Sequence, residues 1–140
     1  MKNSLVSISF VSLFLLGCAN GPSSGNSPQE MFEHLIASPV PAEVTQLQGV
    51  GDTWQGYSLW LRFNAPDAFI RTLTENGYAA VPCNKEMFVL SPGYDLFDPP
   101  WNPSVTQCYE GQIFNDWGNG FHTLGIDSQT DTVYFYGSAP

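Results

Sequence analysis

Basic side chains are scarce in this chain, which has four Lys and Arg residues against thirteen Asp and Glu residues and a net charge of −9. Nucleic-acid binding needs a basic footprint, and anionic lipid heads attract basic segments. The composition therefore argues against nucleic acid as a partner and against attachment to anionic lipid by charge. The acidic surface either keeps the protein soluble or attracts a cationic partner.

Long hydrophobic runs are also absent. The longest apolar stretch, residues 5–16, is interrupted by serines and follows a short head with Lys2 as its one charge. A helix of this length would rise about 18 Å, well short of a hydrocarbon core of roughly 30 Å. A charged head, a short apolar middle and a small residue at its end are typical of an export signal and not of a membrane span.

Leu15-Leu16-Gly17-Cys18 closes the apolar stretch. This tetrapeptide resembles the lipobox of bacterial lipoproteins, although Leu16 stands where Ala or Ser is more usual. The resemblance implies cleavage before Cys18, a diacylglyceryl group on its thiol, palmitate as a label, and anchoring to a membrane. Two or three acyl chains anchor stably, whereas one is marginal. Residues 1–17 are then the signal peptide, and Ala19 in place of Asp points to the outer membrane, facing the periplasm, if the host is Gram-negative.

Cysteine is rare, with three residues in all. If Cys18 carries lipid, Cys83 and Cys108 remain, and export would place them where disulfides persist. A bond between them closes a loop of about 25 residues, worth about 3.5 kcal/mol in the chain-entropy model. They lack the C-x-x-C spacing of a zinc site. We therefore predict a disulfide, with no metal and no cofactor.

Residues 18–27 are polar and rich in Gly and Ser, which is typical of a flexible tether. A first helix follows, because Ser27, Pro28 and Glu30 form a capping box before apolar residues at helical spacing. A second helix is predicted from Pro66 to Asn76, ended by Gly77.

Tyr57, Leu59, Leu61 and Phe63 alternate with Ser58, Trp60 and Arg62, which indicates a strand with one buried face. Further strands are predicted over residues 43–50, 78–81, 107–115, 121–126 and 132–136. Turns are expected at residues 49–52, 117–120 and 127–131, with Asp131 at positive φ. Residues 28–140 should form a single α+β domain, an antiparallel sheet of about five strands with one main helix on a face and a short N-terminal helix.

Catalytic signatures are missing as well: the chain contains no G-x-S-x-G elbow, phosphate loop or H-E-x-x-H. His122 lies near the start of a predicted strand and close to Asp116, and a His–Asp pair can act as a general base. An envelope enzyme acting on a cell-wall polymer, with His122 and Asp95, Asp98 or Asp116, is therefore one alternative. A purely structural envelope component is another.

Aromatic residues gather in and around a segment with four prolines, residues 91–104, which cannot form a regular helix or central strand. The rings form a candidate binding surface, either for a glycan, on whose apolar face rings stack, or for a protein, where Trp and Tyr are enriched. Alternatively, they fold back and fill the core. These candidate residues are Tyr94, Phe97, Trp101, Tyr109 and Trp117. The leading hypothesis is a non-catalytic, lipid-anchored envelope module that binds a protein, for instance a cationic one, or a glycan.

Overall fold

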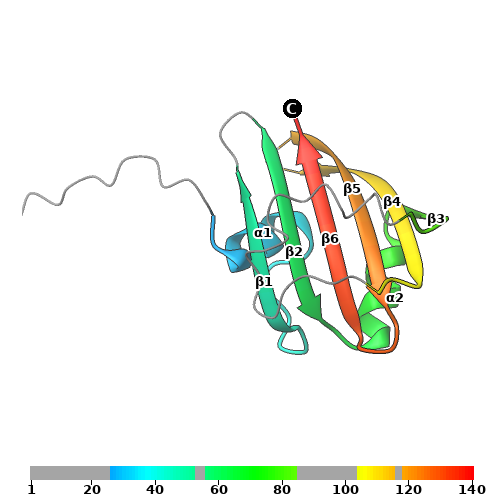
Figure 1. The fold of residues 1–140 in the computed structure, drawn as a ribbon. Helices are drawn as coiled ribbons and strands as arrows, with labels where there is room; N and C mark the ends of the chain where they lie inside the picture. Colours follow the sequence, from blue (N-terminus) through cyan, green and yellow to red (C-terminus); the bar gives the residue numbers. More distant parts are fainter. Residues whose placement is uncertain (1–25, 53–55, 85–103, 116–117) are drawn as a thin grey trace, which may run out of the picture.

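Six antiparallel strands form one sheet in the residues that this computed structural model describes, which are 26–52, 56–84, 104–115 and 118–140 (Figure 1). Their order across the sheet is β1-β2-β6-β5-β4-β3, and every neighbouring pair is antiparallel. The strands are β1 Thr45–Asp52, β2 Tyr57–Asn64, β3 Tyr78–Val81, β4 Gln107–Asn115, β5 Gly118–Asp127 and β6 Thr132–Ala139. The predicted α+β class with an antiparallel sheet is confirmed. The sheet has six strands, close to the five or so that were predicted, and the short β3 pairs with β4 along its length.

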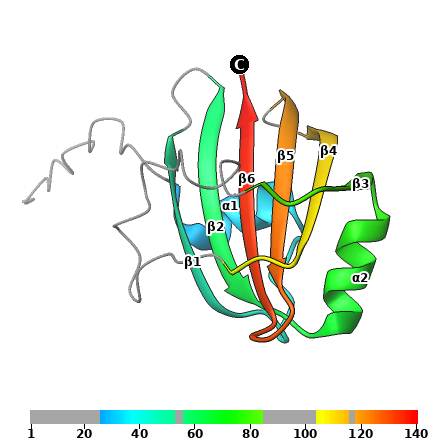
Figure 2. The ribbon, with the colours of Figure 1, turned by 45° about the vertical axis from the view of Figure 1, so that its right-hand side comes forward.

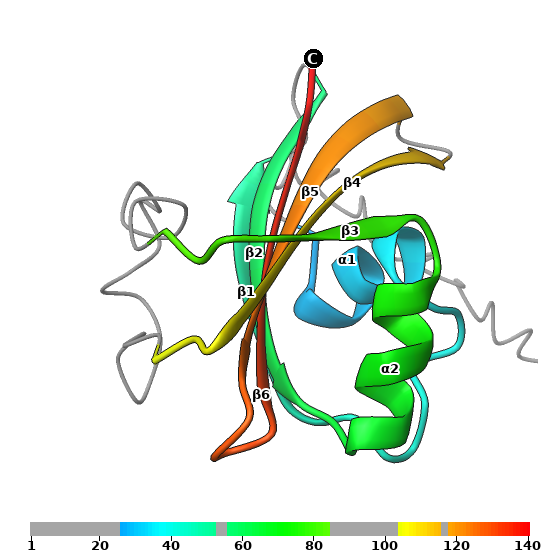
Figure 3. The same cartoon turned by 90° about the vertical axis from the view of Figure 1, so that its right-hand side faces the viewer.

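Both described helices lie on the same side of the sheet (Figure 3). Helix α1, Pro28–Leu35, packs against β1 and β2, and helix α2, Asp67–Glu75, contacts β3 (Figure 2). They are eight and nine residues long; α1 is the short N-terminal helix that the sequence predicted, and α2 lies within the predicted range Pro66 to Asn76. In the described part of the chain, no helix has the length and hydropathy needed to span a bilayer.

Helix α1 begins as its sequence predicts. The Ser27 hydroxyl accepts a hydrogen bond from the Glu30 backbone N–H, and the Glu30 carboxylate accepts one from the Ser27 N–H, at 3.2 and 2.8 Å. This capping box satisfies two backbone donors that a helix N-terminus otherwise leaves unpaired. The helix then buries Met31, Phe32 and Leu35 against the sheet.

Helix α2 follows Pro66 and is followed by Gly77 at φ 84°, the left-handed conformation expected after a helix end. The turn between β5 and β6 is also confirmed, with Asp131 at φ 52°. The Asp127 carboxylate accepts a hydrogen bond from the Gln129 N–H at 3.0 Å within this turn.

Two stretches predicted as turns belong to strands instead. Residues 49–52 continue β1 and pair with Leu61 to Ser58 of β2, and residues 118–120 open β5 opposite Ile113 to Asn115 of β4. A Cβ atom on Gly49 would lie 2.5 Å from Leu61 Cδ2, and one on Gly51 2.3 Å from the Leu59 Cβ. These glycines therefore serve close packing in β1.

Strand β2 has buried side chains on both faces of the sheet. On one face, every second residue from Tyr57 to Phe63 packs in the main core beneath the helices, as predicted. Trp60 and Arg62 on the other side, expected to be open, are only 8% and 7% exposed. We call the first side of the sheet the helix-covered face. The second, on which no helix lies among the described residues, is the helix-free face, and its residues include Gln48, Val50, Trp60, Arg62, Cys108, Glu110, Phe121, Thr123, Tyr134 and Tyr136.

Candidate functional site

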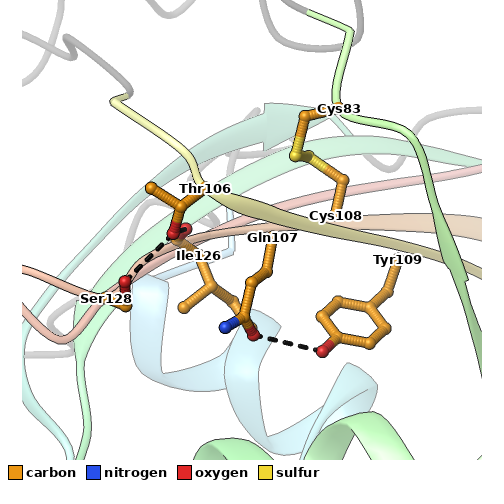
Figure 4. Close-up of a disulfide and its surroundings, with 7 residues drawn as sticks. All are labelled: Cys83, Thr106, Gln107, Cys108, Tyr109, Ile126 and Ser128. Atoms are coloured by element: carbon orange, nitrogen blue, oxygen red, sulfur yellow. Dashed lines mark hydrogen bonds between the residues drawn. A yellow bond between two sulfur atoms is a disulfide. The ribbon is translucent and has the colours of Figure 1, made fainter.

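A disulfide joins Cys83, which follows β3, to Cys108 in β4, as predicted (Figure 4). The register places the two cysteines near each other, because Val81 lies opposite Cys108 and Cys83 follows Val81 by two residues. Cys108 belongs to a second apolar cluster on the helix-free face, together with Trp60 and Tyr134. The bond therefore fixes the end of β3, an edge strand, to the neighbouring strand β4 on that face.

Among the five residues of the candidate aromatic surface, Tyr109 is the one that the structure describes; Tyr94, Phe97, Trp101 and Trp117 lie outside the described residues, as does Cys18. Tyr109 is half-buried at the margin of the main core, on the helix-covered face, and its hydroxyl donates to Gln107 Oε1 at 3.2 Å. The Tyr109 side chain points away from the disulfide of the preceding residue, Cys108 (Figure 4).

His122 is fully buried on the helix-covered face, in β5. Its Nε2 lies 2.6 Å from the Tyr57 hydroxyl of β2, and its Nδ1 lies 3.5 Å from the Tyr78 hydroxyl at the start of β3. The ring of Phe135 approaches it edge-on, with centroids 5.0 Å apart. A neutral imidazole has one donor and one acceptor nitrogen, and a tyrosine hydroxyl can serve either. The Tyr57–His122–Tyr78 bridge thus links three strands through polar groups enclosed in an apolar core.

Three glycines make room for this bridge. A Cβ on Gly120 would lie 1.6 Å from the Tyr57 hydroxyl, and one on Gly111 would lie 3.1 Å from the Tyr78 ring. A Cβ on Gly137, which pairs with His122, would lie 3.2 Å from the imidazole. The sequence showed alternation in both strands, but nothing in it indicated that β2, β3 and β5 bring their polar side chains together.

The surroundings of the bridge favour its uncharged form. Desolvation lowers the pKa of His122 to about 4, because an imidazolium in an apolar core loses its hydration. Burial, and then the nearby Tyr57 phenol, raise the pKa of Tyr78 above its ordinary value. The imidazole is therefore neutral near pH 7 and is enclosed in the main core. The carboxylates suggested to work with it, Asp95, Asp98 and Asp116, lie outside the described residues.

The helix-free face carries a second, smaller aromatic group. The indole of Trp60 stacks on the Tyr136 ring, with centroids 5.1 Å apart and planes at 28°. Arg62 donates to the Gln48 side chain, and Val50, Val81 and Val105 pack around the cluster. Phe121, at the margin of the same face, is 44% exposed.

No family model, curated protein or solved structure matches the chain. In the part of the chain that the structure describes, no three His, Cys, Asp or Glu side chains come together closely enough to hold a metal ion.

Charge is distributed unevenly on the helical layer. Helices α1 and α2 carry Glu30, Glu33, Asp67 and Glu75 at exposed or half-buried positions, against Arg71 as their one Arg or Lys. The other arginine among the described residues, Arg62, is buried on the far side of the sheet. The outer surface of the helices thus presents a net negative charge to solvent.

Proposed function

We propose that the protein is an exported envelope module, anchored by lipid on Cys18, that works by binding a cationic protein and not by catalysis. The observation that carries the proposal is the Cys83–Cys108 bond. Disulfides form and persist in exported proteins, and this one accounts for two of the three cysteines in the chain. It leaves Cys18, at the end of the signal-like stretch, as the residue for the lipid.

Two further features support the binding part of this proposal. The histidine that sequence patterns offered as a general base is enclosed between two tyrosines and is neutral. The helical layer is acidic, and an acidic surface attracts a cationic partner through its long-range field. An acidic domain on a polar tether of residues 18–27 can reach such a partner at a distance from the membrane.

The anchor is tested by labelling cells with palmitate and separating membranes from soluble proteins. The wild-type protein should be labelled and sediment with membranes, whereas Cys18→Ser should be unlabelled and leave the membrane fraction. Cys83→Ser is a matched control for loss of a thiol and should keep its label. Continued labelling of the Cys18 variant would contradict the anchor.

The partner is tested by cross-linking in native membranes, followed by mass spectrometry of the captured proteins. We expect a basic protein whose capture weakens as salt rises toward 1 M, where the Debye length is about 3 Å. The variant Glu30→Gln/Glu33→Gln/Asp67→Asn/Glu75→Gln should lose it, and Gln at residue 30 keeps the capping box. The control Glu110→Gln, on the helix-free face, should retain it. Capture that depends on neither salt nor these carboxylates, or binding to isolated peptidoglycan instead, would overturn the cationic-protein proposal without touching the anchor.

A further inference from the structure

The two edges of the sheet differ in how well they are protected against pairing with another strand (Figure 1). Strand β3 forms one edge, is four residues long and is followed by Pro82, and the disulfide at Cys83 ties its end to β4. Short length and proline both discourage the addition of a strand at an edge. Strand β1 forms the other edge and has eight residues, none of which is Pro, Lys or Arg. The features that protect β3 are thus missing from β1.

The backbone of β1 is regular enough to accept a further strand. The register shifts once, between Thr45 and Gln48, and from there to Asp52 the strand pairs continuously with Arg62 to Ser58 of β2. This regular stretch is about as long as a common β-strand. In an antiparallel pair, alternate residues direct their N–H and C=O groups away from the partner strand. Among the described residues, no strand lies on the side of β1 away from β2, so an incoming strand can pair there.

The exposed charges beside this edge are acidic. Helix α1 crosses β1 and β2 with its first turn on the side of β1 (Figures 1 and 2), and a Cβ on Gly49 would lie 2.9 Å from Met31 Cε of that helix. Glu30, next to Met31, is exposed, as is Glu43, two residues before β1. The chain from α1 to the end of β1 contains no Lys or Arg. Arg62 of β2 contacts β1 from the helix-free face, but it is only 7% exposed.

These charges decide between two kinds of strand that could add to β1. Two copies of β1 paired antiparallel would bring the start of one strand beside the end of the other, and therefore Glu43 of one copy to the end that holds Asp52 of the other. Like charges across a strand pair are destabilising, and the net charge of −9 on each chain adds repulsion over longer distances. A strand rich in Lys or Arg would instead meet acidic residues at both ends of β1 and, in Glu30, on the helix beside it.

We propose that the cationic partner binds through an extended, basic segment that adds to the sheet as a seventh strand, antiparallel or parallel to β1 on the side away from β2. Main-chain hydrogen bonds to β1 provide affinity, and Lys or Arg side chains near Glu30 and Glu43 provide selectivity. This inference rests on the proposed function, because it names the edge of the domain and the form of the segment through which a cationic protein binds.

A capped peptide, Lys-Val-Lys-Thr-Lys-Val-Lys, is the probe for strand addition to the oxidised protein. With the peptide at about ten times its Kd, hydrogen exchange of alternate β1 amides should slow about tenfold, while β3 amides keep their rates. The same peptide with every backbone nitrogen methylated keeps its charge but has no N–H donor, and should bind more weakly by about tenfold or more. Equal affinity of the two peptides, protection confined to other strands, or no binding of either peptide would overturn strand addition.

Charge variants test the placement at β1. Glu30→Gln/Glu43→Gln should weaken binding of the unmethylated peptide about fivefold, because two carboxylates near the edge are lost, and Gln at residue 30 keeps the capping box. The control Asp67→Asn/Glu75→Gln removes the same charge from α2, which contacts β3 at the opposite edge, and should keep the wild-type Kd. Equal weakening by both pairs would show general attraction to an acidic protein and would overturn the β1 site.

Two further outcomes keep this inference separate from the proposed function. The protein alone should sediment as a monomer, and a dimer with protected β1 amides would make a second copy the occupant of the edge and overturn the proposal. Native cross-linking tests the function itself. A captured basic protein whose cross-links all lie on α2 would leave the proposed function standing and overturn the β1 site, whereas failure to capture any basic protein would contradict the function whatever the peptide does.

Discussion

The two faces of the sheet are built from the same strands but from different side chains. In β6, Val133 and Phe135 lie in the main core under the helices, whereas Tyr134 and Tyr136 lie on the helix-free face. The first face is mainly aliphatic residues and Phe, with one enclosed polar bridge at His122. The second combines rings, an arginine and a disulfide. The two helices cover the apolar first face by packing against it. On the second face, the disulfide holds the edge strand β3 in place.

Neighbouring residues of β6 give the sharpest test of this contrast. Phe135→Ala should lower the free energy of unfolding by about 3–5 kcal/mol, because it removes a fully buried ring and leaves a cavity. Tyr134→Ala should cost less, since the phenol lies in the smaller cluster. Urea unfolding followed by far-UV circular dichroism measures both. An equal or larger loss for Tyr134→Ala would mean that the helix-covered face is not the main core.

Removing the disulfide should weaken the helix-free face selectively. Cys83→Ala/Cys108→Ala should lose about 3.5 kcal/mol of unfolding free energy, because the open loop raises the entropy of the unfolded chain. Hydrogen exchange should speed up most in β3 and β4 and least under α1. A loss of unfolding free energy below 1 kcal/mol, or an equal increase in hydrogen exchange throughout the sheet, would contradict this contrast between the two faces.

Acid should act on the helix-covered face through His122. Its pKa is about 4 when folded and near 6.5 when unfolded, so the unfolded chain binds a proton that the folded protein excludes. The stabilisation is complete above pH 6.5 and is lost as the pH falls from 6.5 toward 4, by about 3 kcal/mol.

Unfolding free energies measured between pH 7 and pH 4 test this loss. His122→Gln should flatten the curve relative to wild type. Parallel curves for wild type and His122→Gln would show that the imidazole is not the group that titrates.

The smallest predicted loss concerns the room made for the Tyr57–His122–Tyr78 bridge. Gly120→Ala should cost about 1–3 kcal/mol through overpacking, because its Cβ would overlap the Tyr57 hydroxyl. In Gly77→Ala the new Cβ would meet no atom within 4 Å, but the residue would still have to adopt φ 84°. Its loss of about 1 kcal/mol of unfolding free energy is therefore conformational only. Thermal unfolding of both variants separates lack of space from strain. An unchanged thermal stability of Gly120→Ala would show that the side chains of the bridge can move aside.

The features that the sequence predicted well are those set by near neighbours. The capping box at Ser27, the helix end at Gly77 and the turn at Asp131 each depend on a few consecutive residues. The disulfide followed from counting the cysteines. These features were within reach because their physical causes lie within one turn of chain or in simple arithmetic.

The errors share a different cause, contact across the sheet. Gly51 and Gly120 were taken for turn residues because glycine favours turns, but each makes room for a side chain of another strand. Trp60 was expected on an open face because strand alternation cannot show that both faces are buried. The His122 bridge needed the order of the strands, which no local pattern contains.

The mass of the intact protein, purified from membranes without reduction, tests the central claim of an exported, lipid-anchored domain most directly. The account predicts a chain that starts at Cys18, carries lipid on that residue, and lacks the two thiol hydrogens of Cys83 and Cys108. A chain that retains residues 1–17, starts at another residue, or carries an unmodified Cys18 would contradict it.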